Sequence, residues 1–105
     1  MNKERKLMYF YFTEDYSLEF FANDKYTVLK VIAENQENVD GFPYCSLSQQ
    51  EIADIARMAK AKTNKIIGEL LKRGYLSLFQ GKRGKYYITE KGAKALWIIQ
   101  SGERK

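Results

Sequence analysis

Residues 47–52 define the start of a helix more sharply than any other part of this 105-residue chain. Ser48 stands three residues before Glu51, the spacing of a capping box, in which each side chain binds the backbone N–H of the other residue. Leu47 and Ile52 are placed to form the matching hydrophobic staple. The pattern predicts a helix that begins directly after Ser48. Its expected buried face consists of Ile52, Ala53, Ile55 and Ala56.

A second, basic helix is predicted over residues 60–73, because Gly74 is of the residue type favoured just after a helix end. One side of this helix is apolar at helical spacing. The residues on that side are Thr63, Ile66, Ile67, Leu70 and Leu71. The other side and its flank carry polar residues, namely Lys62, Asn64, Lys65 and Lys72. The helix therefore presents a basic face away from the expected core.

Two further segments precede these helices. A helix is predicted over residues 24–37, and its apolar face consists of Val28, Leu29, Val31 and Ile32. Residues 38–43, Asn-Val-Asp-Gly-Phe-Pro, have the composition of a turn, since glycine permits a positive φ and proline restricts its neighbour to extended backbone. Only a short extended stretch can then fit before Ser48.

The second half of the chain predicts a hairpin and a closing helix. Residues 75–79 and 85–89 alternate like two strands joined by the loop 80–84. Their inward-facing residues are expected to be Leu76, Leu78, Tyr86 and Ile88. Thr89 can cap a last helix that runs to about residue 99.

The positive charge is concentrated in the basic helix and the hairpin. Residues 57–85 contain nine basic residues and one acidic residue, a net charge of +8, while the whole chain carries +5, so the remainder carries −3. Each phosphate that Lys or Arg neutralises releases a condensed counterion. This charge distribution is therefore typical of a surface that binds a polyanion.

Missing residue types argue against catalysis. The chain has no histidine, the usual general base near neutral pH, and Cys45 is its only cysteine. We therefore expect no enzyme activity, no catalytic or metal site and no cofactor. A lone cysteine fits a reducing compartment, and no apolar run reaches about 18 residues. We expect a cytoplasmic protein without a membrane span or signal peptide.

Residues 7–12, Leu-Met-Tyr-Phe-Tyr-Phe, form an aromatic segment before the first helix. In a strand both faces of this segment would be apolar, so another surface must cover it. That surface is either its own domain or a dimer interface. In the closing helix four consecutive apolar residues from Leu96 to Ile99 would cover more of the helix than one domain can bury. We expect a homodimer in which the two groups pair, with interface residues Met8, Phe10, Phe12, Leu96, Trp97 and Ile98.

The order of these elements resembles the winged helix-turn-helix family over about residues 24–92. Three stretches carry the resemblance: Leu-Ser-Gln-Gln-Glu-Ile-Ala at 47–53, Ile-Ile-Gly-Glu-Leu-Leu-Lys-Arg-Gly-Tyr-Leu at 66–76, and Tyr-Ile-Thr-Glu-Lys-Gly at 87–92. The wing and recognition helix are similar to those of the MarR group and of small bacterial, plasmid or phage regulators. Two residues depart from the pattern. Arg57 stands where the turn usually has glycine, and Ala59 where a Ser-like residue usually caps the recognition helix.

The resemblance implies an α+β, mostly α fold: a winged helix-turn-helix with an extra aromatic N-terminal segment and a C-terminal helix. Residues 1–23 would be the aromatic segment and a candidate dimerisation arm, 24–101 the DNA-binding domain and 102–105 a tail. Helix 60–73 would enter the major groove of double-stranded DNA, and wing residues 80–85 would grip phosphate or the minor groove. The residues expected at the DNA are Ser48, Gln49, Lys60, Lys62, Asn64, Lys65, Lys72, Lys82, Arg83 and Lys85.

Three functions fit this resemblance. The first is a sequence-specific, dimeric transcriptional repressor. The second is a plasmid or phage DNA segregation (centromere-binding) protein with a filament-forming partner, or a replication protein. The third is a winged-helix module that binds proteins and no DNA, which the basic helix face opposes.

Overall fold

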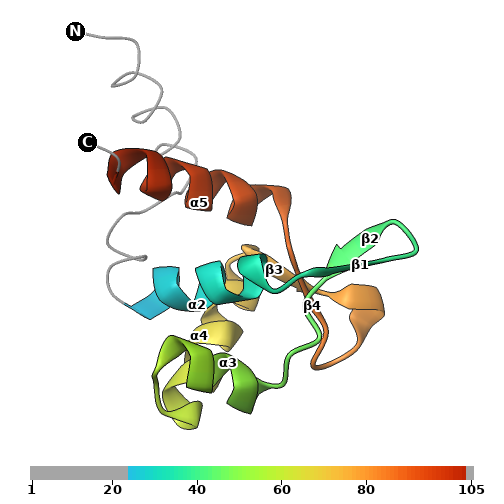
Figure 1. The fold of residues 1–105 in the computed structure, drawn as a ribbon, viewed down its shortest axis with the longest axis horizontal. Coiled ribbons are helices and arrows are strands. Elements are labelled where there is room, and N and C mark those ends of the chain that lie inside the picture. Colours follow the sequence, from blue (N-terminus) through green and yellow to red (C-terminus); the bar gives the residue numbers. More distant parts are fainter. Residues whose placement is uncertain (1–23, 104–105) are drawn as a thin grey trace, which may run out of the picture.

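The computed structural model describes residues 24–103, which form four α-helices and two antiparallel two-stranded sheets (Figure 1). The expected class, α+β and mostly helical, is confirmed. The predicted interface residues Met8, Phe10 and Phe12 lie outside the described residues. The helices are α2 (Asp24–Glu34), α3 (Gln49–Ala56), α4 (Lys60–Lys72) and α5 (Glu90–Glu103). The strands are β1 (Glu37–Val39), β2 (Phe42–Tyr44), β3 (Leu76–Leu78) and β4 (Tyr86–Ile88), with a short 3₁₀ turn η1 (Phe79–Gly81) after β3.

The spatial order of the elements is that of a winged helix-turn-helix. α2, α3 and α4 pack against one another, and the β3–β4 hairpin, the wing, follows α4 (Figure 1). In the wing, Leu76 is paired with Ile88 and Leu78 with Tyr86. α5 lies on the other side of α2 from α3 (Figure 1). The expected fold is therefore confirmed for the described residues.

Residues 38–43 were predicted to be a turn. In the structure they form a hairpin, because β1 and β2 pair on either side of Asp40 and Gly41. Asp40 and Gly41 both have positive φ, 53° and 84°, as the two central residues of a type I′ hairpin turn require. The Asp-Gly pair was the missed signal. Beyond β2, Cys45 exchanges two backbone hydrogen bonds with Tyr86 of β4, at 2.6 and 3.0 Å, and so joins this hairpin to the wing.

α2 ends at Glu34, three residues before the predicted end at residue 37. The side-chain amide of Asn35 donates to the carbonyl of Val31 at 2.8 Å, which satisfies a carbonyl that a longer helix would use. The next residue, Gln36, accepts a hydrogen bond from the backbone N–H of Ile88 at 3.0 Å. This contact ties the end of α2 to the wing.

The core contains the apolar faces that the sequence predicted for α2 and α4. Val28, Leu29, Val31 and Ile32 are buried, as are Thr63, Ile66, Ile67 and Leu70. The prediction for Ile55 was wrong, because this side chain is 51% exposed. α3 has only eight residues, and its buried arc centres between Ile52 and Ala53. Ile55 lies roughly 100° from that centre on the helix.

Two separate sequence motifs meet where α4 ends and α5 begins. The hydroxyl of Thr89 donates to the carbonyl of Gly74 at 2.6 Å and accepts from the N–H of Gly92 at 3.0 Å, so Thr89 caps α5 as predicted. The ammonium group of Lys91 donates to the carbonyl of Arg73 at 2.9 Å. These bonds fix the wing and α5 to the end of the recognition helix.

The capping box is present at the start of α3. The Ser48 hydroxyl accepts from the Glu51 N–H at 3.1 Å, and the Ser48 N–H donates to the Glu51 carboxylate at 2.9 Å. We expect Ser48→Ala to lower the free energy of unfolding by about 1 kcal/mol, since it leaves a helix N–H unsatisfied. Urea denaturation checks this value. Ala59 precedes α4 without a side-chain cap, so Ala59→Ser should raise stability; an effect of the opposite sign in either variant would contradict this account.

Candidate nucleic-acid interface

A groove of about 650 Å³ lies between the start of α3, the outer face of α4 and the wing. Its wall on α3 consists of Ser48, Gln49 and Gln50, and α4 contributes polar and small residues with two apolar residues at the base. The lining residues of α4 are Lys60, Asn64, Ile67, Gly68 and Leu71, and those of the wing are Leu78, Arg83, Gly84 and Tyr86.

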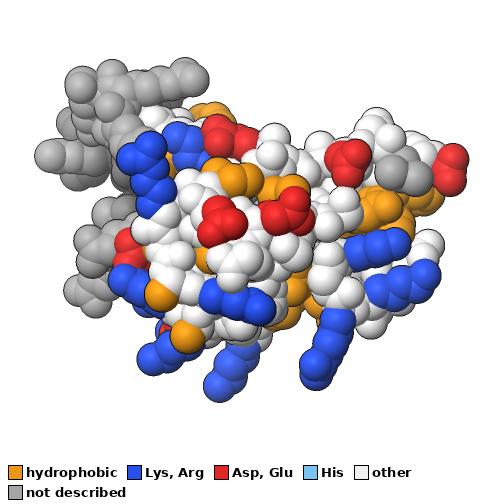
Figure 2. Space-filling model, turned by 60° about the horizontal axis from the view of Figure 1, so that its bottom comes forward, with side chains coloured by type: hydrophobic (Ala, Val, Ile, Leu, Met, Phe, Trp, Pro, Cys, Tyr) orange, Lys and Arg blue, Asp and Glu red, His pale blue; other side chains and the backbone are white. Residues whose placement is uncertain are grey.

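The structure brings together five of the ten residues predicted at the DNA. Ser48, Gln49, Lys60, Asn64 and Arg83 all line the groove. Three more, Lys65, Lys72 and Lys82, are exposed on α4 and the wing without lining it. Figure 2 shows Lys and Arg side chains projecting along the lower edge of the domain, with acidic side chains above them.

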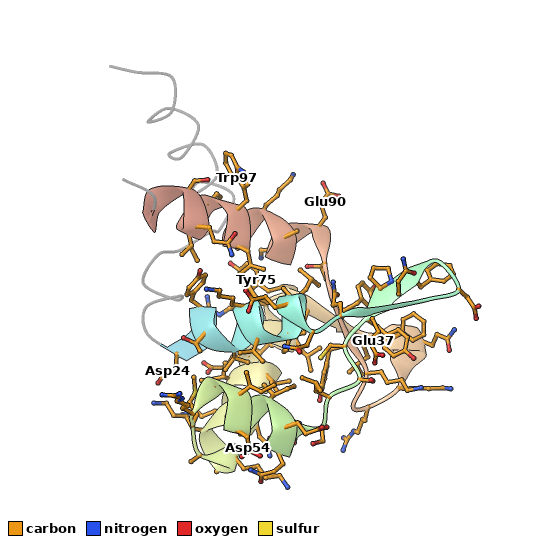
Figure 3. All side chains as sticks on the ribbon, viewed as in Figure 1. Asp24, Glu37, Asp54, Tyr75, Glu90 and Trp97 are labelled. Atoms are coloured by element: carbon orange, nitrogen blue, oxygen red, sulfur yellow. The ribbon has the colours of Figure 1, made fainter. Side chains whose placement is uncertain are left out.

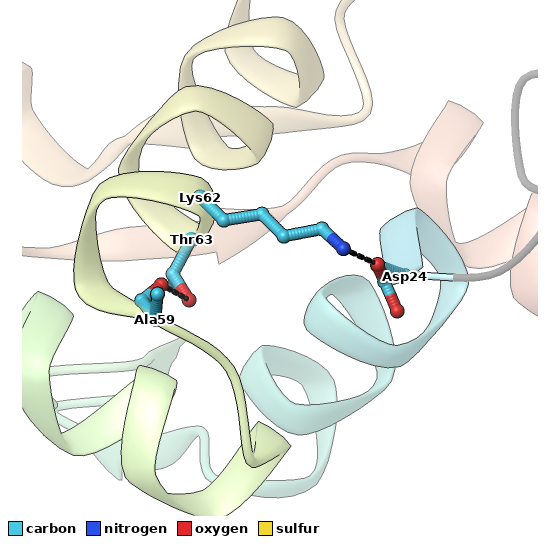
Figure 4. A network of polar contacts seen from close by, with 4 residues as sticks. All are labelled: Asp24, Ala59, Lys62 and Thr63. Atoms are coloured by element: carbon cyan, nitrogen blue, oxygen red, sulfur yellow. Dashed lines mark hydrogen bonds and ion pairs between the residues drawn. The ribbon is translucent and has the colours of Figure 1, made fainter.

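Lys62 is placed differently from the other basic residues of α4. Its ammonium group forms an ion pair with the carboxylate of Asp24 at the start of α2 (Figure 4). The neighbouring Thr63 is buried, and its hydroxyl donates to the carbonyl of Ala59 at 3.0 Å. Lys62 therefore links the recognition helix to α2, and it does not line the groove with Lys60 and Asn64.

Lys85, at the base of the wing, lies against the aromatic residues that join the two hairpins. Its ammonium nitrogen is 5.5 Å from the ring centre of Tyr44, within the range of a cation–π contact. Tyr44 in turn stacks on Phe79 with ring centres 4.3 Å apart. Phe42 flanks Phe79 at 6.4 Å and is 60% exposed. This aromatic cluster was not predicted from the sequence, because it depends on the β1–β2 hairpin.

Tyr86 connects the wing to the start of α3. Its ring is buried, and its hydroxyl accepts a hydrogen bond from the Gln49 side-chain amide at 3.3 Å. The alternation of residues 85–89 predicted that Tyr86 points inward, but it did not reveal the contact with Gln49. Since both residues line the groove, this bond joins its two walls.

Asn64 has an unusual environment on α4. Within the described residues its side-chain oxygen is buried and has no hydrogen-bond partner, although the residue lines the groove. Buried polar atoms are nearly always hydrogen-bonded, and an unpaired one costs about 1–3 kcal/mol. The side-chain oxygen of Asn64 therefore adds nothing to the hydrogen bonding within residues 24–103.

The turn between α3 and α4 contains a residue in the left-handed conformation, which favours glycine. Arg57 has φ 59° and ψ 49°, the left-handed conformation that glycine adopts without strain. Its backbone N–H still closes α3 by bonding to the carbonyl of Asp54 at 3.2 Å. Met58 packs against the core between the helices, as predicted.

The predicted dimer residues on α5 fall into two groups. Leu96 and Ile98 are 8% and 2% exposed and belong to the core of the domain. The domain thus buries more of α5 than the sequence suggested, because Leu96 and Ile98 lie about 200° apart around the helix and both belong to the core. Trp97 is 58% exposed, and Figure 3 shows its side chain standing away from α2.

The described residues have neither a cluster suited to a metal ion nor a helix suited to a membrane span. Residues 24–103 contain no cluster of three or more His, Cys, Asp or Glu side chains placed to hold a metal ion. No helix in that part of the chain is long and apolar enough to cross a membrane.

The described residues define a winged helix-turn-helix domain with a basic groove. The fold resembles that of the reduced (Fe(II)) CO-sensing protein from R. rubrum, with a TM-score of 0.60 and 18% sequence identity over 74% of this chain and 38% of that chain. Reduced CprK without ligand matches with a TM-score of 0.48 and 17% identity over 73% of this chain and 38% of that chain. This chain therefore spans well under half the length of both proteins. No protein-family model and no curated protein matches the sequence.

Proposed function

We propose that this chain binds double-stranded DNA sequence-specifically as a homodimer and acts as a transcriptional repressor. α4 would lie in the major groove, with Asn64 and Lys60 toward the bases, and the wing would contact phosphate or the adjacent minor groove. Lys65, Lys72, Lys82 and Arg83 would contact phosphates, as would the start of α3 at Ser48 and Gln49. Lys62 and Lys85 would support this surface, because each already has a partner within the domain.

One observation carries the proposal: the groove combines an exposed recognition-helix face with basic residues that the core does not need. Residues 57–85 carry a net charge of +8 in a chain of +5. The apolar face of α4 is buried against the other elements without any of the lysines. The fold shared with the CO-sensing protein is consistent with DNA binding, and the proposal does not include gas sensing.

The salt dependence of binding tests the role of the wing. We expect log K to fall linearly with log[salt], and the pair of substitutions Lys82→Ala and Arg83→Ala to reduce the slope by about 2, since each phosphate contact contributes about 0.9. Fluorescence anisotropy with a DNA duplex between about 50 and 200 mM salt measures this slope. Lys94→Ala is the matched control, because Lys94 lies on α5 outside the groove and should leave the slope unchanged.

An unchanged slope in the double variant would remove the wing from the interface. Absence of any salt-dependent binding by the unmodified chain would overturn DNA binding itself and favour the protein-interaction module. The genomic position of the bound site separates the two DNA functions. A site that overlaps the promoter of the protein's own gene supports repression, whereas an array of repeats beside a filament-forming partner gene supports segregation.

A further inference from the structure

A second hollow, between α2 and α5, takes no part in the groove of the recognition helix. It has a volume of about 380 Å³, and its apolar lining residues are Ala33, Ile88, Ala93, Leu96 and Trp97. Glu34 at the end of α2, Gln36 just beyond it and Gln100 on α5 add polar groups. Trp97 is 58% exposed, whereas Leu96 is 8% exposed. Figure 3 shows Trp97 standing out from α5 on the side away from α2, so it can only edge the hollow.

We propose that this α2–α5 groove is the seat for residues 7–12 of a second copy of the chain, with Trp97 at its outer edge. The proposal rests on the homodimer of the proposed function and names the surfaces that form it. Of the three α5 residues expected at the dimer interface, Leu96 contributes only to the floor of the groove and Ile98 lies in the core. Trp97 remains as the exposed contact.

Chain length makes this exchange feasible. Residues 13–23, eleven residues, separate the aromatic segment from α2. An extended chain of eleven residues spans at most about 36–40 Å, which is enough to reach a neighbouring domain. This length allows residues 7–12 of one copy to contact α5 of another.

The composition of the segment favours a second copy over its own groove. As an extended strand it has one face of Met8, Phe10 and Phe12 and another of Leu7, Tyr9 and Tyr11. One groove can cover only one of these faces. In a two-fold dimer the partner's groove would cover one face and the partner's own segment could cover the other, an arrangement that an isologous interface permits. The tyrosine hydroxyls suit the polar groups at the edge of the groove.

The area involved is sufficient for a stable dimer. Phe10 and Phe12 of both protomers are four aromatic side chains, and at about 150–250 Å² each they would bury roughly 600–1,000 Å². Stable interfaces bury about 1,200–2,000 Å² in total. The exposed 58% of each Trp97 and the remaining apolar residues of the segment would raise the area into this range.

Disulfide trapping tests the proposal directly, because the single natural cysteine should not form disulfides. Cys45 is fully buried, and burial raises the pKa of its thiol, so it stays protonated and unreactive. One chain carries Phe10→Cys and the other Trp97→Cys, and the two are mixed at micromolar concentration under mild oxidation. We expect a covalent heterodimer in the mixture that exceeds the homodimers formed by either chain alone. A chain with both substitutions, oxidised at nanomolar concentration, reports contact within one chain.

Cross-linking only within the doubly substituted chain, or no cross-linking in either format, would overturn the proposal. Sedimentation provides a second measurement on unoxidised protein. Ala93→Arg places a long charged side chain in the groove at an exposed position and should yield monomers. Ile55→Ala removes an exposed apolar side chain from α3, outside the groove, and should leave the dimer intact. Melting curves confirm that each variant is folded, and DNA binding by the unmodified chain is measured separately, so that failure of the proposed function is distinguishable.

Discussion

Replacing Gly92 by alanine is expected to lower the free energy of unfolding by about 3 kcal/mol, the upper end of the usual cost of overpacking. A Cβ at this position would lie 2.2 Å from the carbonyl oxygen of Tyr75 and 3.1 Å from a methyl carbon of Ile88. Tyr75 cannot easily move, because its side chain is fully buried and its N–H is bonded to the carbonyl of Leu70 at 2.9 Å. The same Tyr75 carbonyl accepts from the N–H of Thr89 at 3.3 Å. Thermal or urea denaturation by circular dichroism measures the loss.

Gly68 provides the matched control for Gly92, since both glycines lie within helices. A Cβ on Gly68 would meet nothing within 4 Å. Gly68→Ala should therefore raise the free energy of unfolding by up to about 1 kcal/mol, the difference in helix propensity. Equal stability changes in the two variants would show that Tyr75 can shift and that the contact with Gly92 is not tight. Because Gly68 lines the groove, weaker DNA binding by the more stable Gly68→Ala variant would indicate close approach of DNA to α4.

The second large effect is expected at Asn64. Asn64→Ala should reduce the discrimination between cognate and scrambled DNA by about 1–3 kcal/mol, or roughly 5- to 150-fold, because an amide that reads a base is lost. Stability should stay unchanged or rise, since the substitution removes a buried oxygen that has no partner within residues 24–103. Competition binding with the two duplexes, together with denaturation curves, measures both quantities.

Lys65→Ala is the control for Asn64→Ala. Lys65 is exposed one residue further along α4 and is proposed to contact phosphate, so its loss should weaken binding to both duplexes alike. An equal loss on both duplexes in the Asn64→Ala variant would assign Asn64 to the backbone as well. A clear loss of stability in that variant would show that the amide has a partner in the folded protein.

The local patterns of the sequence predicted most of the helices and the wing. Ser48 and Glu51 specify the start of α3 because both partners of the capping box lie within one turn. Gly74 was expected to end the recognition helix, and α4 ends at Lys72 with Gly74 at φ 82°. The apolar faces of α2 and α4 were predicted correctly because helical periodicity depends only on neighbouring residues. The missed β1–β2 hairpin also had a local signal, the positive-φ pair Asp40-Gly41.

The candidate site was predicted only in part. Periodicity could show that Lys62 and Asn64 lie outside the core, but the two residues have different surroundings. Lys62 reaches Asp24 of another helix, and Asn64 lines the groove with Arg83 of the wing. These separations along the chain are too long for any local pattern to specify which face of a helix meets which neighbour.

The sequence alone determined the helices and the wing, the basic character of α4 and the wing, and the position of the helix-turn-helix, but not the β1–β2 hairpin. Tertiary structure alone decided how the elements meet. It placed Gly92 against the carbonyl of Tyr75, joined Tyr86 to Gln49 across the groove and divided α5 into buried Leu96 and Ile98 and exposed Trp97. The physical reason is that helix starts, turns and periodicity depend on interactions within a few residues. Burial depends on close packing between segments far apart in the chain, which fills the interior with few voids and so selects one arrangement.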